Sequence, residues 1–257
     1  MTTITQHTYA DYLSQNVSNK SILITGGTTG IGRATSLMLA SAGANVLLTG
    51  QDQAHLEDTL KDAGKMGVGD RIKAIIANMS TAAGIKKIFD EVDKRFASLD
   101  VLINNAALAY QSVTEGNYEE WEHIIKTNLL GYLACSNQAI ERMKARKAGH
   151  IVNIGSMSAD VREKGSSVYV ATKSGIQGFS ESLRKEVNES GIKISLIEPG
   201  AVGTDMQPYS LEEQREKEKD LEMLQAEDIA YAVLYCLAQP LRCDVVELKV
   251  RPHLQMI

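Results

Sequence analysis

A glycine-rich turn between an apolar segment and a helical segment constrains the fold of this chain more than any other feature. Residues 22–32 read ILITGGTTGIG, in which a strand-like run leads into the turn. Gly26 permits a tight turn, Gly30 lets a phosphate group approach the backbone, and Gly32 allows the next helix to pack closely on the strand. The helix N-terminus presents free N–H groups to an anion. The segment therefore predicts a dinucleotide-binding site, although its G-x-x-x-G-x-G spacing differs from G-x-G-x-x-G and also fits a simple turn.

Strand and helix patterns alternate through the rest of the chain. After the first strand, further strands are predicted at residues 45–49, 71–76, 100–104, 150–155, 192–197 and 245–250. Helices are predicted at residues 33–40, 53–62, 82–97, 118–146 (with Asn128 or Gly131 as the candidate position of a break), 167–189, 211–219 and 226–238. This alternation predicts an α/β fold, a Rossmann-type doubly wound parallel sheet of about seven strands with helices on both faces. The loops that follow the strands should surround one crevice, because ligands bind such sheets beyond the carboxyl ends of the strands.

Composition and charge argue against several classes of protein. The 257 residues are 44% hydrophobic and carry a net charge of −5 with scattered basic residues, so we expect no nucleic-acid surface. No apolar run reaches membrane-spanning length. The three cysteines do not have the spacing of metal ligands, and an odd number of cysteines does not suit a disulfide framework. We therefore expect a cytoplasmic protein with no metal site and no membrane contact. Residues 20–257 should form a single domain, preceded at 1–19 by a polar extension that is either a short helix or a loose arm.

Candidate reacting groups follow the fifth predicted strand. Ser156 comes directly after this strand, and Tyr169 and Lys173 lie four residues apart on one face of the next helix. An unperturbed tyrosine has a pKa of about 10, and a neighbouring ammonium favours the phenolate and lowers that value. Asn128 lies within the long predicted helix, where its side chain can anchor a water molecule that links Lys173 to solvent. By itself, the spacing of Tyr169 and Lys173 also fits a surface pair on an amphipathic helix.

Taken together, the motifs of the chain resemble those of the short-chain dehydrogenase/reductase family from residue 20 to residue 250. The motifs are TGGTTGIG at 25–32, NNAA at 104–107, KTN at 126–128, Ser156, YVATK at 169–173 and PGAVGT at 199–204. The resemblance implies that Tyr169 is the catalytic acid/base and that Ser156 orients the substrate oxygen. It implies further that Lys173 holds the nicotinamide ribose and lowers the pKa of Tyr169, and that Asn128 supports a proton-relay water.

The resemblance also implies a cofactor site, with Asn104 and Ala106 flanking the cofactor and residues 199–204 at its nicotinamide end. The predicted cofactor-binding residues are Gly26, Thr28, Thr29, Gly30, Ile31, Gly32, Gln51, Asn78, Met79, Asn105, Ala106, Tyr169, Lys173, Pro199, Gly200, Val202 and Thr204. Two positions depart from the family pattern, because Ala107 replaces the usual glycine and Asn78 the usual aspartate. The carbonyl oxygen of Asn78 can still accept a hydrogen bond from the adenine amino group.

The end of the second predicted strand bears on the choice of dinucleotide. An acidic residue there binds the ribose hydroxyls and repels a 2′-phosphate, whereas an arginine attracts the phosphate. This chain has Gly50 at the usual acid position and Gln51 where NADP-preferring relatives often carry arginine. The missing acid favours NADP(H) over NAD(H), unless the side chain of Asp52 turns inward instead of capping the next helix.

Substrate recognition is less specified by the sequence. The predicted substrate-binding residues are Ser156, Met157, Tyr169 and Met206, and residues 205–225 form either a substrate-side lid or an ordinary solvated loop. Residues 246–252 resemble the ending of hydroxy-acid and aldehyde reductases. Arg162 is a candidate partner for a substrate carboxylate, although its charged neighbours favour a solvated cluster.

The leading interpretation is an NAD(P)-dependent oxidoreductase that transfers a hydride between the nicotinamide and a carbonyl or secondary alcohol. A non-catalytic dinucleotide-binding sensor or structural protein on the same fold is one alternative, and an epimerase or dehydratase is another. Because relatives usually assemble as dimers or tetramers, we expect a homodimer or homotetramer that acts on a small molecule.

Overall fold

A parallel seven-stranded sheet is the centre of the computed structural model, which describes residues 16–255. The strands are β1 (Ser21–Ile24), β2 (Asn45–Gly50), β3 (Ile72–Ile76), β4 (Val101–Asn104), β5 (Gly149–Ile154), β6 (Ile192–Pro199) and β7 (Glu247–Val250). They lie in the order β3-β2-β1-β4-β5-β6-β7. The strand order reverses between β1 and β4, and such a reversal opens a crevice beyond the carboxyl ends of the strands. The predicted doubly wound α/β sheet is confirmed.

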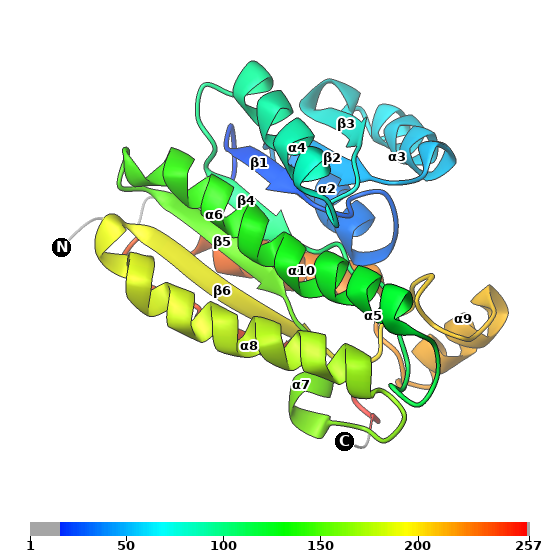
Figure 1. Cartoon of the computed structure of the whole chain (residues 1–257). Helices are drawn as coiled ribbons and strands as arrows, with labels where there is room; N and C mark the ends of the chain where they lie inside the picture. Colours follow the sequence, from blue (N-terminus) through cyan, green and yellow to red (C-terminus); the bar gives the residue numbers. More distant parts are fainter. Residues whose placement is uncertain (1–15, 256–257) are drawn as a thin grey trace.

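Helices cover both faces of this sheet (Figure 1). One face carries α2 (Gly30–Ser41), α3 (Gln53–Lys65) and α10 (Ala226–Ala238), and the other carries α4 (Ala82–Arg95), α6 (Gly131–Lys144) and α8 (Ser167–Val187). The shorter helices are α5 (Tyr118–Ile125), α7 (Ser158–Val161) and α9 (Leu211–Lys219), with single turns at Gly69–Arg71 and Asn188–Ser190. The predicted helix boundaries agree with these to within a few residues, but α7 was not predicted because four residues are too short to show a helical period.

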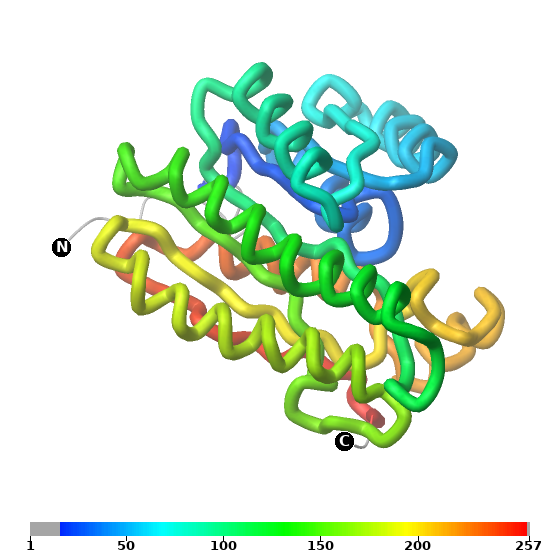
Figure 2. The backbone as a smooth tube through the Cα atoms, in the orientation of Figure 1, coloured from blue at the N-terminus to red at the C-terminus, as the bar shows by residue number. Residues whose placement is uncertain are grey.

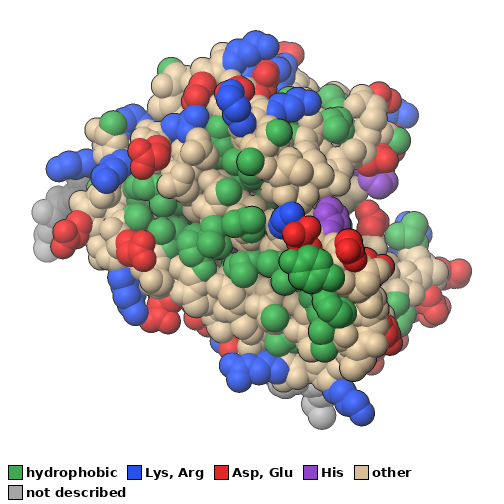
Figure 3. All heavy atoms as spheres, in the orientation of Figure 1, with side chains coloured by type: hydrophobic (Ala, Val, Ile, Leu, Met, Phe, Trp, Pro, Cys, Tyr) green, Lys and Arg blue, Asp and Glu red, His purple; other side chains and the backbone are tan. Residues whose placement is uncertain are grey.

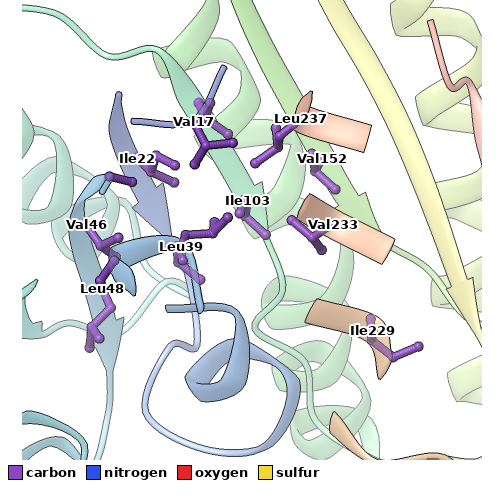
Figure 4. Close-up of a cluster of buried hydrophobic side chains, with 14 of the residues drawn as sticks. Val17, Ile22, Leu39, Val46, Leu48, Ile103, Val152, Ile229, Val233 and Leu237 are labelled. Carbon is purple, nitrogen blue, oxygen red and sulfur yellow. The ribbon is translucent and has the colours of Figure 1, made fainter. Parts of the chain in front are cut away.

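Successive strand residues enter opposite cores. Ile22 and Ile24 of β1 pack in the core shared with α2 and α10, whereas Leu23 packs in the core under α4, α6 and α8. Figure 4 shows the first core, where Leu39 of α2 and Val233 of α10 lie close to Ile103. A central strand therefore reads as a continuous apolar run because both of its faces are buried.

The long predicted helix is interrupted where the sequence indicated. α5 ends at Ile125, a π-helical turn spans Lys126–Leu130, and α6 begins at Gly131, so the tube in Figure 2 continues without reversing direction. The N–H group of Gly131 donates to the carbonyl oxygen of Lys126. A Cβ atom at Gly131 would lie 3.1 Å from the carbonyl oxygen of Met79 and 2.7 Å from Cε at the end of its side chain, so the start of α6 is closely packed. The turn places Asn128, which is fully buried, against the loop that follows β4.

The surface bears on the remaining predictions. In Figure 3, apolar side chains gather over the face that carries α5 and α6, where Ile125, Leu130 and Leu133 are exposed. The predicted homo-oligomer stays a prediction.

Among the described residues, no helix has the length and apolar character needed to cross a membrane. Most of the predicted extension at 1–19 lies outside the described residues.

Candidate active site

A cleft of about 370 Å³ opens where the strand order reverses. Its walls are the loops after β1 to β6 together with the first turns of α8. Predicted site residues that line it are Gly26, Thr28, Thr29, Gly30, Ile31, Gln51, Met79, Asn105, Ala106, Ser156, Tyr169, Lys173, Pro199, Gly200, Val202, Thr204 and Met206. Predicted residues that do not line this cleft are Gly32, Asn78, Asn104, Asn128 and Met157. Side chains far apart in the sequence thus meet at one edge of the sheet.

The glycine-rich turn is packed as its sequence predicts. A Cβ atom at Gly32 would lie 2.0 Å from the carbonyl oxygen of Gly26, and one at Gly26 would lie 2.7 Å from Cα of Ala106. Gly26 and Gly30 both have positive φ, at 63° and 48°. The side chain of Asn105 donates to the carbonyl oxygens of Thr25 and Gly26, at 3.1 and 2.8 Å. The turn is therefore locked against the loop after β4 and cannot accept side chains at these glycines.

The N-terminus of α2 suits an anionic ligand. In the described chain, the first turn of α2 holds no acidic residue, and no side chain caps its amides at Thr29. A Cβ atom at Gly30 would come within 3.0 Å of Thr204, so only glycine keeps this approach open. Free amides, a positive dipole end and a narrow glycine cradle fit the pyrophosphate of a dinucleotide.

The predicted reacting groups come together at the inner end of the cleft. Ser156 follows β5, and Tyr169 and Lys173 reach the same place from α8. The ammonium of Lys173 donates to the carbonyl oxygen of Ile154 at 3.0 Å and lies 5.6 Å from the ring centroid of Tyr169. Lys173 is only 2% exposed. Tyr169 and Lys173 are therefore not a surface pair on an amphipathic helix, because the ammonium is buried beneath the cleft.

Burial dominates the proton affinities of these groups. It raises the pKa of Tyr169 to about 12, while the nearby Ser156 hydroxyl acts in the opposite direction and the Glu163 carboxylate raises the pKa further. Burial lowers the pKa of Lys173 to about 7, opposed by the Glu198 carboxylate. Burial, and not Lys173, therefore determines the direction in which the pKa of Tyr169 is shifted, which differs from the lowering that was expected.

Asn128 has a different local role from the one its position suggested. Its side-chain oxygen accepts from the N–H of Leu108, and its side-chain nitrogen donates to the carbonyl oxygen of Leu108, both at 2.8 Å. These bonds hold the loop after β4 and use one acceptor site and one donor hydrogen of the side-chain amide. The role of Asn128 in a proton relay stays a prediction, and its side chain is engaged elsewhere.

Two other asparagines are turned away from the cleft. Asn104 is the last residue of β4, is fully buried, and donates to Asn153 and Ser136 within the core. Asn105 and Ala106, which were also predicted to bind the cofactor and which follow the strand end, do line the cleft. The oxygen of Asn78 accepts from the N–H and hydroxyl of Ser80 in an Asx-type turn, and Asn78 does not line the cleft.

The far end of the cleft shows why the usual acid is missing there. A Cβ atom at Gly50 would lie 2.5 Å from Cγ2 of Thr28, so this position has no room for a side chain. Asp52 caps α3, because its Oδ1 accepts from the N–H of His55 at 2.9 Å. His55 also lines the cleft and was not predicted. Its place in the first turn of the helix after β2 is the signal that could have identified it.

A second hollow of about 790 Å³ adjoins the cleft. Ser156, Tyr169 and Met206 line both spaces, and Met157 lines the hollow, as predicted for substrate contacts. Its lining includes three carboxylates, and among the described residues that line it none is Lys, Arg or His. The carboxylates belong to Glu115, Glu120 and Glu163. Arg162, the expected carboxylate partner, instead donates to the carbonyl oxygen of Ala159 and does not line the hollow.

Comparison with known proteins agrees with this geometry. Residues 20–215 match the family described as short chain dehydrogenase. An uncharacterized oxidoreductase of Staphylococcus saprophyticus is 31% identical over 239 residues, which cover 92% of this chain and 98% of that protein. An uncharacterized oxidoreductase of Staphylococcus aureus strain USA300 is 30% identical over 237 residues, with the same shares covered. The chain therefore belongs to the short-chain dehydrogenase family and is an oxidoreductase of the kind that binds NAD(P) and acts on small molecules.

Solved structures show the same fold. The crystal structure of gox2181 superposes with a TM-score of 0.82 at 22% identity, covering 94% of this chain and 98% of the other. A metagenomic short-chain oxidoreductase in complex with NADP superposes with a TM-score of 0.79 at 25% identity, covering 93% of this chain and 100% of the other.

Proposed function

We propose that this enzyme transfers a hydride between NADP(H) and a carbonyl or secondary alcohol, with Tyr169 as the acid/base. The observation that carries the proposal is that Tyr169 and Ser156 line both the cleft and the hollow. A substrate oxygen held by these two hydroxyls in the hollow would therefore present its carbon to a nicotinamide in the cleft.

Each side chain has a definite task in this reaction. The hydroxyl of Tyr169 gives its proton to the forming alkoxide during reduction and takes the alcohol proton during oxidation. The hydroxyl of Ser156 donates to the same oxygen and orients it. The ammonium of Lys173 is held by Ile154 beneath the Tyr169 ring, where its charge favours the phenolate. A nicotinamide bound in the cleft would supply or accept the hydride and, in its oxidised form, would contribute a positive charge that also favours the phenolate.

A substrate screen tests this function. We expect purified enzyme to change the nicotinamide absorbance with at least some members of a panel of ketones, aldehydes and secondary alcohols. If calorimetry shows cofactor binding but no compound changes the absorbance, the sensor interpretation replaces this proposal. Product formation without net cofactor consumption would instead support an epimerase or dehydratase.

The charge of the hollow narrows the substrate class. Glu115, Glu120 and Glu163 surround it without a lining cation, so an anionic substrate meets repulsion and no counter-ion. Within the panel, we expect keto acids to react with at least about tenfold lower kcat/KM than their amides, because two nearby like charges cost roughly 1 kcal/mol or more in partly screened surroundings. A preference for the acids would show that Arg162 turns into the hollow on binding.

Residues 205–225 form the proposed lid over the hollow. The two ends of this segment are tied together, because Gly203 donates to the carbonyl oxygen of Leu224 and Leu224 donates to that of Ala201. Met206 and Gln207 line both spaces, and α9 stands out from the body near the carboxyl ends of the strands (Figure 1). A segment with paired ends and few core contacts is suited to move as a unit and exclude water.

We expect kcat/KM to be higher with NADP than with NAD. Gly50 cannot place an acid against the ribose, and Asp52 directs its carboxylate to the amide of His55. Asp52→Asn keeps an oxygen that can cap α3. In this variant the ratio of kcat/KM with NADP to kcat/KM with NAD should rise by no more than about fivefold, which is the effect expected from removing one exposed charge. A strong preference of the wild type for NAD, or a far larger rise in the variant, would mean that Asp52 faces the ribose.

A further inference from the structure

A second tyrosine lies beside Lys173, outside the motifs that identify the active site. Tyr132 is on α6, in the core beneath the cleft, and is fully buried. Its ring centroid lies 5.8 Å from Nζ of Lys173, close to the 5.6 Å that separates this atom from the Tyr169 ring. The hydroxyl of Tyr132 donates at 3.3 Å to the carbonyl oxygen of Ile154, which also accepts from Lys173 at 3.0 Å.

The buried ammonium needs such support. A charged amine taken out of water requires several hydrogen-bond acceptors or aromatic faces to replace its hydration, and the described residues give this one a single hydrogen bond, to the carbonyl oxygen of Ile154. An aromatic face attracts a cation, most strongly where water is excluded. Tyr132 supplies this attraction without carrying charge itself, because burial raises the pKa of its phenol well above the ordinary value.

The other titratable groups around Lys173 do not replace Tyr132. Tyr169 lies on the same helix, and its phenol must change protonation during the proposed reaction. Glu198 of β6 favours the charged lysine, but its own pKa is raised to about 7 by burial, so it is only partly ionised near neutral pH. Cys135, one turn along α6 from Tyr132, has its thiol pKa raised to about 12 by burial and stays neutral. The Tyr132 ring is a support for the ammonium that does not vary with pH.

We propose that Tyr132 is a positioning residue for Lys173. The ring face of Tyr132, together with the Ile154 carbonyl oxygen to which both residues donate, holds the ammonium beneath Tyr169 in its charged form. The inference rests on the proposed function of Tyr169. A charged Lys173 favours the Tyr169 phenolate, which is the form that takes the proton in alcohol oxidation. Tyr132 therefore helps to set the lowest pH at which oxidation proceeds.

The test compares Tyr132→Leu, which removes the ring face, with Tyr132→Phe, which keeps it. In Tyr132→Leu, Lys173 should lose its proton at lower pH, so the acidic limb of kcat/KM for oxidation should move to higher pH by about half a unit or more. Tyr132→Phe should keep the limb within about 0.2 units, because the ring and the Ile154 carbonyl both remain. The same order should be seen in the proton affinity of Lys173, read from the 15N shift of its ammonium in lysine-labelled protein.

A matched control separates positioning from general loosening of the core. Met143→Ala opens a void on the same buried side of α6, about 16 Å along the helix from Tyr132, and should leave the limb in place. If Tyr132→Leu does not fold, Tyr132→Met fills the space without a ring face and must show the same shift. An unmoved limb in the variant that lacks the ring, or an equal shift in Met143→Ala, overturns the role of Tyr132. If Tyr169→Phe keeps its activity, the proposed function fails first.

Discussion

Replacement of Tyr169 by phenylalanine is expected to lower kcat by about a thousandfold, within the range that positioned acid/base groups contribute. The substitution removes only the hydroxyl, and the ring that packs against the Lys173 ammonium remains. No other phenol described in the cleft lies beside Ser156, so no neighbouring group takes over the proton transfer. Cofactor affinity measured by calorimetry should change by less than about threefold, because the glycine cradle is untouched.

Tyr110→Phe is the matched control for this result. Tyr110 also presents a phenol to the hollow, but its hydroxyl donates to Glu120 at 2.7 Å and does not reach the cleft. Its removal should change kcat by less than about tenfold, the scale of one lost hydrogen bond. Equal kcat values for Tyr169→Phe and the wild type would remove Tyr169 as the acid/base, whatever the control shows.

The sequence located the site because strand ends of a parallel sheet meet at one edge. Ser156 and the turn after β1 follow strands, and Tyr169 and Lys173 open the next helix, so their meeting required only the correct alternation of strands and helices. The break before Gly131 was also readable, since glycine within a helical pattern marks a weak point. Local pattern was sufficient for these features.

Orientation at single residues was not readable. Asn104 and Asn105 are neighbours, but the strand ends between them, so one side chain enters the core and the other faces the cleft. The side chain of Asn128 was expected to be available for a water molecule. Its hydrogen bonds to the backbone of Leu108 could not be predicted, because Leu108 lies 20 residues away in the chain. The support that Tyr132 gives to Lys173 likewise depends on how α6 and α8 pack over β5, which no local pattern specifies.

The balance of burial and charge was the other feature that sequence reasoning missed. It treated Lys173 as an ordinary ammonium that lowers the pKa of Tyr169. Burial instead raises the pKa of Tyr169 and lowers that of Lys173, so it favours the neutral form of both groups. A close opposite charge favours an ionised group only where desolvation does not exceed it. The Glu198 carboxylate opposes this shift at Lys173, and it lies on β6, away from Lys173 in the sequence.

Lys173→Met should separate the catalytic use of this lysine from its effect on stability. We expect kcat to fall by about a hundredfold or more, because the phenolate loses its neighbouring charge. The free energy of unfolding should stay equal or rise near pH 7, since methionine fills the same buried space without a desolvated amine. A catalytic loss without a loss of stability distinguishes an active-site lysine from a structural one.

The pH dependence of stability makes the same variant a direct test of the buried ammonium. The folded lysine has a pKa of about 7, below its ordinary value of 10.5, so between these values the unfolded chain binds more protons than the folded one. Stability of the wild type should therefore rise with pH relative to Lys173→Met, by at most about 1.4 kcal/mol per pH unit. Urea unfolding between about pH 8.5 and 10 measures this rise mostly above the pH range in which Glu198, with its pKa of about 7, titrates.

Lys87→Met is the control for that measurement. Lys87 donates to the carbonyl oxygen of Ile76 at 2.8 Å, much as Lys173 donates to that of Ile154, but it is exposed. Because its ammonium is exposed to water, this variant removes no buried charge, and its stability is the reference against which Lys173→Met is compared. A stability difference between the wild type and Lys173→Met that stays flat with pH would mean that solvent reaches the Lys173 ammonium, and the account of a buried charge held beneath Tyr169 would have to be abandoned.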